Sequence, residues 1–181
     1  MSKARMETKT ITTLGILTAV ALVLGYVEHL IPITTIPGIK LGLANTVLLY
    51  ALYLLDIRSA VILMVLKVGL SGFLFGGVTA MMYSFAGGVL SLAAMLLIKR
   101  LPGVSIIGVS ALGAVMHNIG QLLVASLIVE TRAVMIYLPV LLVSAVVTGI
   151  LTGVVAKYAI KGLRPGTDGK NKKEVPLEEE K

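Results

Sequence analysis

Long apolar runs separated by short polar breaks make up most of the chain. Six runs can be distinguished: Ile11–Val27, Leu41–Leu55, Ile57–Phe75, Val78–Ile98, Ile106–Val129 and Ala133–Ile160. Most of them reach the ~20 residues that an α-helix needs to cross the ~30 Å hydrocarbon core of a bilayer. The second run is short, and the last is long enough to extend into the cytoplasm. This pattern predicts an all-α, polytopic membrane protein, a compact bundle of about six transmembrane helices.

The breaks between the runs have the composition of turns. His29–Lys40 contains prolines and a glycine, which cannot continue a helix. The others are the charged turns Asp56–Arg58, Lys99–Gly103 and Glu130–Arg132 and the uncharged glycine hinge Phe75–Gly77. We therefore expect a transmembrane domain over residues 11–163, between a basic N-terminus (1–10) and a disordered tail (164–181).

Composition and charge fit this organisation. The mean hydropathy is +0.98 and only 14% of residues are charged, too few for the polar shell of a soluble domain. With the N-terminus inside, thirteen of the sixteen Lys and Arg residues fall on the inner side. Lys40 and Arg132 fall outside, and Lys67 lies within a run. This asymmetry predicts that both termini are cytoplasmic, and it accounts for the net charge of +7 without nucleic acid.

Lys67 is the charged residue whose placement in the hydrocarbon core costs the most free energy. It follows Arg58 by nine residues, which is ~14 Å of helix rise and close to the bilayer midplane. A lysine there costs about 2.5–3.5 kcal/mol on insertion scales. It either faces a polar cavity, where it binds an anion or a carbonyl, or makes an internal hydrogen bond between helices.

A second group of polar residues lies in the fifth run. His117, Asn118 and Gln121 are spaced so that they share one broad helix face near mid-depth. They either line a cavity or tie helices together, with Gly113 and Gly120 allowing close approach. A metal site is not expected, because one histidine with two amides supplies too few ligands.

The third feature is the Pro-Gly turn that leads into the second run. Lys40 stands at the mouth of this predicted helix, whose free N–H groups favour an anion, and Asn45 lies about one turn further in. Glu28 and His29 can instead pair with Lys40, which is the structural alternative.

The first run carries small residues four apart. Gly15 with Ala19 and Ala21 with Gly25 form small-xxx-small pairs, which pack internally or dock a partner membrane protein.

Several kinds of chemistry are excluded by what the chain lacks. There is no GxxxxGK[ST] motif for ATP and no cysteine for thiolate chemistry. Its two aspartates, Asp56 and Asp168, cannot form the carboxylate cluster that Mg²⁺-diphosphate chemistry needs. We therefore expect neither an enzyme nor a resident cofactor.

Three motifs together resemble one bacterial membrane family. They are Pro37–Asn45, the stretch from Leu66 to Gly76 and Gly113–Gln121, and the resemblance covers residues from about Thr10 to Gly162. The family is known both as heptaprenyl diphosphate synthase component I and as the Gx transporter family. It is similar to the substrate-binding S-components of energy-coupling factor transporters.

The resemblance implies a multi-pass protein of the bacterial cytoplasmic membrane. An S-component captures a scarce small molecule from outside and needs a separate coupling subunit and two ATPases. The small residues of the first helix would pack against the coupling subunit. Lys40, Asn45, Lys67, His117, Asn118 and Gln121 would then bind a small, anionic or amphiphilic ligand, such as a prenyl phosphate. The alternative is a non-catalytic membrane subunit that partners a prenyl diphosphate synthase. We favour the S-component-like interpretation at this stage, because a partner subunit has no evident need for polar residues inside the membrane.

Overall fold

The computed structural model describes residues 3–30 and 42–163, and almost all of them are helical. The α-helices are α1 (Lys3–Leu30), α2 (Leu43–Leu54), α3 (Ile57–Ser71), α4 (Gly77–Ile98), α5 (Ile106–Ile128) and α6 (Leu138–Leu163). A π-helical segment, Gly72–Gly76, follows α3, and a 3₁₀ segment, Arg132–Tyr137, precedes α6. The all-α prediction is confirmed, and each apolar run corresponds to one helix.

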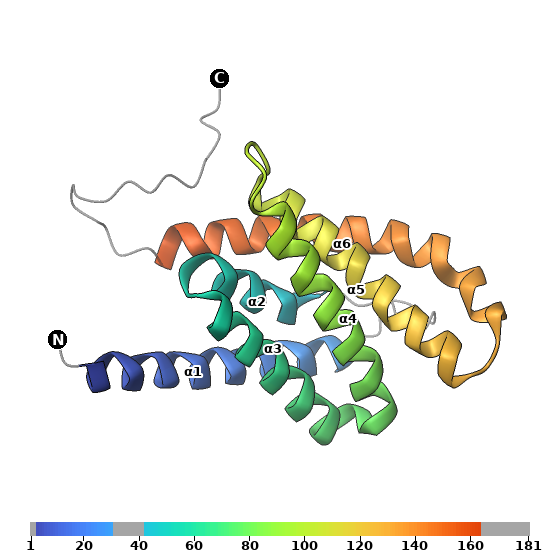
Figure 1. Ribbon diagram of the computed structural model, residues 1–181, viewed down its shortest axis with the longest axis horizontal. Coiled ribbons are helices and arrows are strands. Elements are labelled where there is room, and N and C mark those ends of the chain that lie inside the picture. The colour runs from blue at the N-terminus through green and yellow to red at the C-terminus, as the bar shows by residue number, and fades with distance from the viewer. Residues whose placement is uncertain (1–2, 31–41, 164–181) are drawn as a thin grey trace.

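Helices α3 and α4 form a hairpin that closes at the predicted glycine hinge. Gly77 has φ +73°, a left-handed conformation that residues with a Cβ rarely adopt. Gly72 lies against Met81, and Gly88 lies against Met64, so the two helices run antiparallel in contact. Figure 1 shows this reversal where α3 meets α4.

Four apolar helical stretches are long enough to cross a membrane. They are Thr8–Glu28, Ile57–Ile98, Ile106–Ile128 and Met135–Gly162. The second of them is the α3–α4 hairpin, so it contains two helical arms. Helix α2 has 12 residues and rises only ~18 Å, less than a bilayer core. These are the helices of a membrane protein, while the number of crossings stays a prediction.

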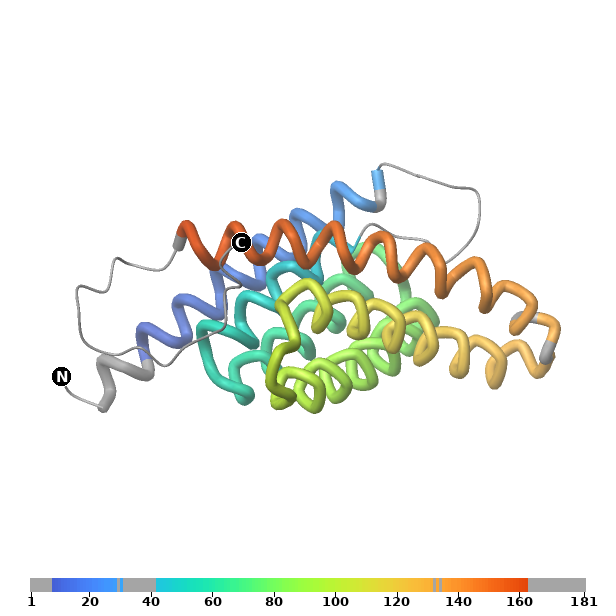
Figure 2. Tube along the Cα trace, turned by 90° about the horizontal axis from the view of Figure 1, so that it is seen from above, coloured from blue at the N-terminus to red at the C-terminus, as the bar shows by residue number. Residues whose placement is uncertain are grey.

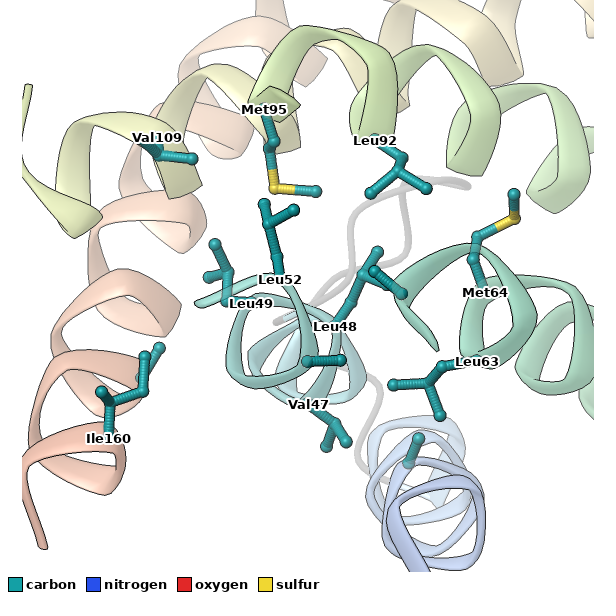
Figure 3. Packing of buried hydrophobic residues seen from close by; sticks show 14 of the residues in the cluster. Val47, Leu48, Leu49, Leu52, Leu63, Met64, Leu92, Met95, Val109 and Ile160 are labelled. Carbon is teal, nitrogen blue, oxygen red and sulfur yellow. The ribbon is translucent and has the colours of Figure 1, made fainter. Parts of the chain in front are cut away.

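The short helix α2 lies at the centre of the bundle. Figure 3 shows its leucines pointing in several directions, Leu49 toward Ile160 of α6, Leu48 toward Met64 of α3 and Leu52 toward Met95 of α4. Leu49 and Leu52 are almost completely buried. Because other helices surround α2 on several sides, α2 can be shorter than the hydrocarbon core of the bilayer.

The outer surface of the bundle is apolar. Exposed large hydrophobic side chains occur along every α-helix except α2, for example Val23 on α1, Ile62 on α3 and Val143 on α6. Such a surface suits hydrocarbon and would be unusual for a protein in water. The start of α1 and the end of α6 lie at the same end of the bundle (Figures 1 and 2). This arrangement agrees with an even number of crossings.

Asp56 ends the turn between α2 and α3 and caps α3. Its carboxylate accepts a hydrogen bond from the Ser59 backbone N–H at 2.8 Å. Hydrogen bonds from the Ser59 side chain and backbone hold the pKa of Asp56 below its ordinary value of 3.8. Because the folded-state pKa is the lower one, the stabilisation is complete above pH 3.8 and is lost as the pH falls through the folded-state pKa.

We therefore expect Asp56→Ala to lower the melting temperature at pH 7 and to have a much smaller effect near the folded-state pKa. Thermal unfolding in detergent at several pH values measures this difference. Ser105 caps α5 with an uncharged hydroxyl, which accepts from the Gly108 N–H at 3.2 Å. Ser105→Ala is the matched control and should cost the same at every pH, and a pH-independent cost for Asp56→Ala would contradict the assignment.

Candidate functional site: polar residues between the helices

Lys67 and Asn45 are brought together. The Lys67 Nζ donates a hydrogen bond to the Asn45 Oδ1 at 2.6 Å, linking α3 to the first turn of α2. Both side chains are half-buried. A cation that donates to a neutral acceptor makes a stronger bond than two neutral groups do. The structure therefore contains the hydrogen bond between helices that is one of the two interpretations of Lys67.

The N-terminus of α2 is capped by the carboxylate of Glu28. Glu28, near the end of α1, accepts a hydrogen bond from the Leu43 backbone N–H through its Oε1 at 2.9 Å. The sequence predicted that an anion would favour this helix terminus, and here Glu28 fills that role. Lys40, the predicted entrance residue, lies outside the described residues, as does the Pro-Gly turn before it.

The three polar residues of α5 point to two different neighbours. Asn118 donates through Nδ2 to the Leu141 carbonyl of α6 at 2.9 Å. His117 and Gln121 instead pack closely against Gly87 of α4. Consecutive residues on a helix are about 100° apart, so His117 and Asn118 reach opposite partners. The broad shared face of the sequence prediction is therefore divided between α4 and α6.

Glycines permit this close packing of α5. A Cβ on Gly120 would lie 2.8 Å from the Ala86 carbonyl oxygen and 2.9 Å from the Gly87 Cα. Gly149 and Gly153 of α6 approach α5 similarly, with a Cβ on either meeting backbone atoms at 2.7–2.8 Å. Beside them, the hydroxyls of Ser110 and Thr152 hydrogen-bond at 3.0 Å. Small residues and short polar side chains are the usual means of joining helices in lipid.

The small residues of α1 are not equivalent. Ala21 is only 1% exposed, and a Cβ placed on Gly25 would lie 3.9 Å from the Ala44 Cβ of α2, so both residues face the interior. Gly15 and Ala19 are exposed, and nothing lies within 4 Å of a Cβ placed on Gly15. Only this outer pair is accessible to a partner helix, and its docking role stays a prediction.

Two polar residues with notable surroundings, Lys99 and Thr46, were not among the functional candidates predicted from the sequence. Lys99, counted there only for topology, donates to the Leu52 carbonyl at 2.5 Å and lies 4.5 Å from the centre of the Tyr53 ring. Partial burial lowers the pKa of Lys99, although much of its side chain is exposed. The buried Thr46 hydroxyl has no hydrogen-bond partner among the described residues. Neither property has a local sequence signal, because each depends on how α2 packs against distant helices.

The described residues contain no cluster of three or more His, Cys, Asp or Glu side chains that could hold a metal ion. Asp56 lies in a turn, where its carboxylate caps a helix, and Asp168 lies outside the described residues.

We expect the loss of the Glu28 cap to destabilise α2. Glu28→Ala should lower the free energy of unfolding by about 0.5–2 kcal/mol, the usual cost of losing a helix cap. Glu28→Gln keeps an acceptor oxygen and should retain most of that stability. Reversible unfolding in mixed micelles measures both, and equal losses would show that the charge of Glu28 matters and its hydrogen bond does not.

Comparison with known proteins gives one match. A family model described as heptaprenyl diphosphate synthase component I matches residues 17–159, most of the chain and all but the start and end of the bundle. No curated protein and no solved structure matches the chain.

Proposed function

The chain belongs to the heptaprenyl diphosphate synthase component I family, and on that premise we propose that it is the non-catalytic membrane subunit of a prenyl diphosphate synthase. In this role it holds a soluble catalytic subunit at the membrane, where a long prenyl product must be delivered. The product has an apolar chain, so a synthase anchored at the bilayer releases it directly into the solvent that suits it. The Mg²⁺-binding carboxylates come from the catalytic subunit.

One observation carries this proposal over the S-component-like interpretation. The case for a ligand site rested on polar residues inside the membrane that a partner subunit would not need. Asn45 and Lys67 bind each other, and Asn118 binds a backbone carbonyl of α6. Such bonds lower the cost of polar groups in lipid by joining helices, so their presence requires no ligand.

A substrate-binding protein is the second candidate, and the buried Thr46 hydroxyl favours it. This hydroxyl has no hydrogen-bond partner among the residues that the structure describes. A buried hydroxyl that makes no hydrogen bond costs about 1–3 kcal/mol, and a bound ligand is one way to recover that energy. In that case the ligand would be a small anionic or amphiphilic molecule. Gly15 and Ala19 would face a coupling subunit that works with ATPases.

Synthase activity in proteoliposomes tests the proposal. A purified catalytic prenyl diphosphate synthase subunit from the same organism is assayed alone, with empty liposomes and with liposomes that contain this protein. We expect the protein to recruit the catalytic subunit to the vesicles and to raise the rate of long-chain product formation. Equal rates and no recruitment would contradict the proposal.

A further inference from the structure

One end of the bundle is strongly basic. The start of α1, the α2–α3 and α4–α5 turns and the end of α6 lie toward the same end of the bundle (Figure 1). The described side chains of these segments include six cations. They are Lys9, Arg58, Lys99, Arg100, Lys157 and Lys161, and we call this surface the basic end. Asp56 is the one acidic side chain described there, whereas the opposite end carries Glu28 and Glu130.

Lys99 places positive charge over the middle of this end. Its ammonium group binds the Leu52 carbonyl in the last turn of α2, and α2 is the central helix of the bundle (Figure 3). Partial negative charge at the C-terminus of a helix attracts a cation to this position. The cation therefore lies at the end of the central helix.

The same contact brings two turns of the basic end together. Lys99 and Arg100 begin the α4–α5 turn, and Arg58 follows Asp56 at the start of α3. Because Lys99 is bonded to α2, this turn is held beside the end of α2, to which the Arg58 turn is directly joined. Arg58 and Arg100 are both exposed, so their guanidinium groups are available to a partner.

We propose that the basic end is the docking surface for an acidic face of the soluble catalytic subunit. This inference rests on the proposed function and adds where and how the partner binds. Topology alone explains why Lys and Arg lie on one side of the membrane, but it does not require a cation over the central helix. Charges spread over a whole end surface favour association with a complementary surface and make it sensitive to salt.

The test measures binding of the purified catalytic subunit to proteoliposomes made of zwitterionic phosphatidylcholine. The double variant Arg58→Gln/Arg100→Gln should weaken binding by about tenfold or more at low salt, and this difference should shrink as salt screens the charges. Arg58→Lys/Arg100→Lys keeps the charge and should bind nearly normally. Glu130→Gln changes charge at the opposite end and should have no effect.

The outcomes separate this inference from the proposed function. If the unchanged protein binds the catalytic subunit but the Gln variant binds equally well, the basic end is not the docking surface, and the proposed function stands. If the unchanged protein does not bind it at all, the proposed function fails. In a third outcome, the Gln variant loses binding of the catalytic subunit only in vesicles that contain phosphatidylglycerol. That result would show that the basic end contacts anionic lipid, and it would overturn this inference.

Discussion

Gly120→Ala is expected to cause one of the largest losses of stability of any single substitution in the chain. A Cβ at this position meets the Ala86 carbonyl oxygen and the Gly87 Cα at 2.8–2.9 Å, and backbone atoms cannot rotate away as a side chain can. Helices α4 and α5 must therefore separate. Overpacking of this kind costs about 1–3 kcal/mol and sometimes more. Reversible unfolding in mixed micelles measures the loss.

Gly15→Ala is the matched control for this substitution. Gly15 lies on the exposed face of α1, and nothing stands within 4 Å of the added methyl group. Alanine there should be neutral or slightly stabilising, because it favours helix more than glycine does. If both variants had the same stability, α4 and α5 would not be packed as closely as described.

The second large effect concerns Lys67 and Asn45. Lys67→Met and Asn45→Ala should each destabilise the bundle, because each removes the hydrogen bond between these two side chains. The double variant should cost less than the two single losses combined. We expect a coupling energy of about 1–2 kcal/mol, since the bond joins a cation to an amide in a nonaqueous environment.

This double-mutant cycle also separates the two interpretations of Lys67. The cycle is measured on ligand-free protein, so a residue kept only to bind a ligand would show no coupling with Asn45. Lys67→Met paired with Ser105→Ala provides the control, because Ser105 caps α5 and makes no hydrogen bond to Lys67 or Asn45. Additive losses in the Lys67–Asn45 cycle would contradict the structural bond.

The helices could be predicted from the sequence because their signals are local. The apolar runs identified all six α-helices, and the glycines at Phe75–Gly77 identified the hairpin. The runs did not show that α2 lies at the centre of the bundle. A buried helix and a lipid-facing helix are equally apolar, so composition cannot distinguish them.

The polar contacts could be predicted only in part. Lys67, Asn45 and Asn118 were recognised because polar groups in lipid are costly, but their partners lie 22 or more residues away in the chain. Lys40, which the sequence offered as a partner of Glu28, lies outside the described residues, and within them Glu28 accepts a hydrogen bond from the Leu43 backbone. A backbone N–H is present at nearly every residue, so no residue type identifies such a partner.

Native mass spectrometry of the protein, purified in mild detergent from its own membranes, distinguishes a synthase subunit from a substrate-binding protein. If the protein is a synthase subunit, we expect a complex that contains a prenyl diphosphate synthase subunit and loses it at high salt, with no small molecule retained in the membrane protein. A bound anionic amphiphile, together with a coupling subunit and ATPases and without a synthase, would contradict the synthase role and establish a substrate-binding protein.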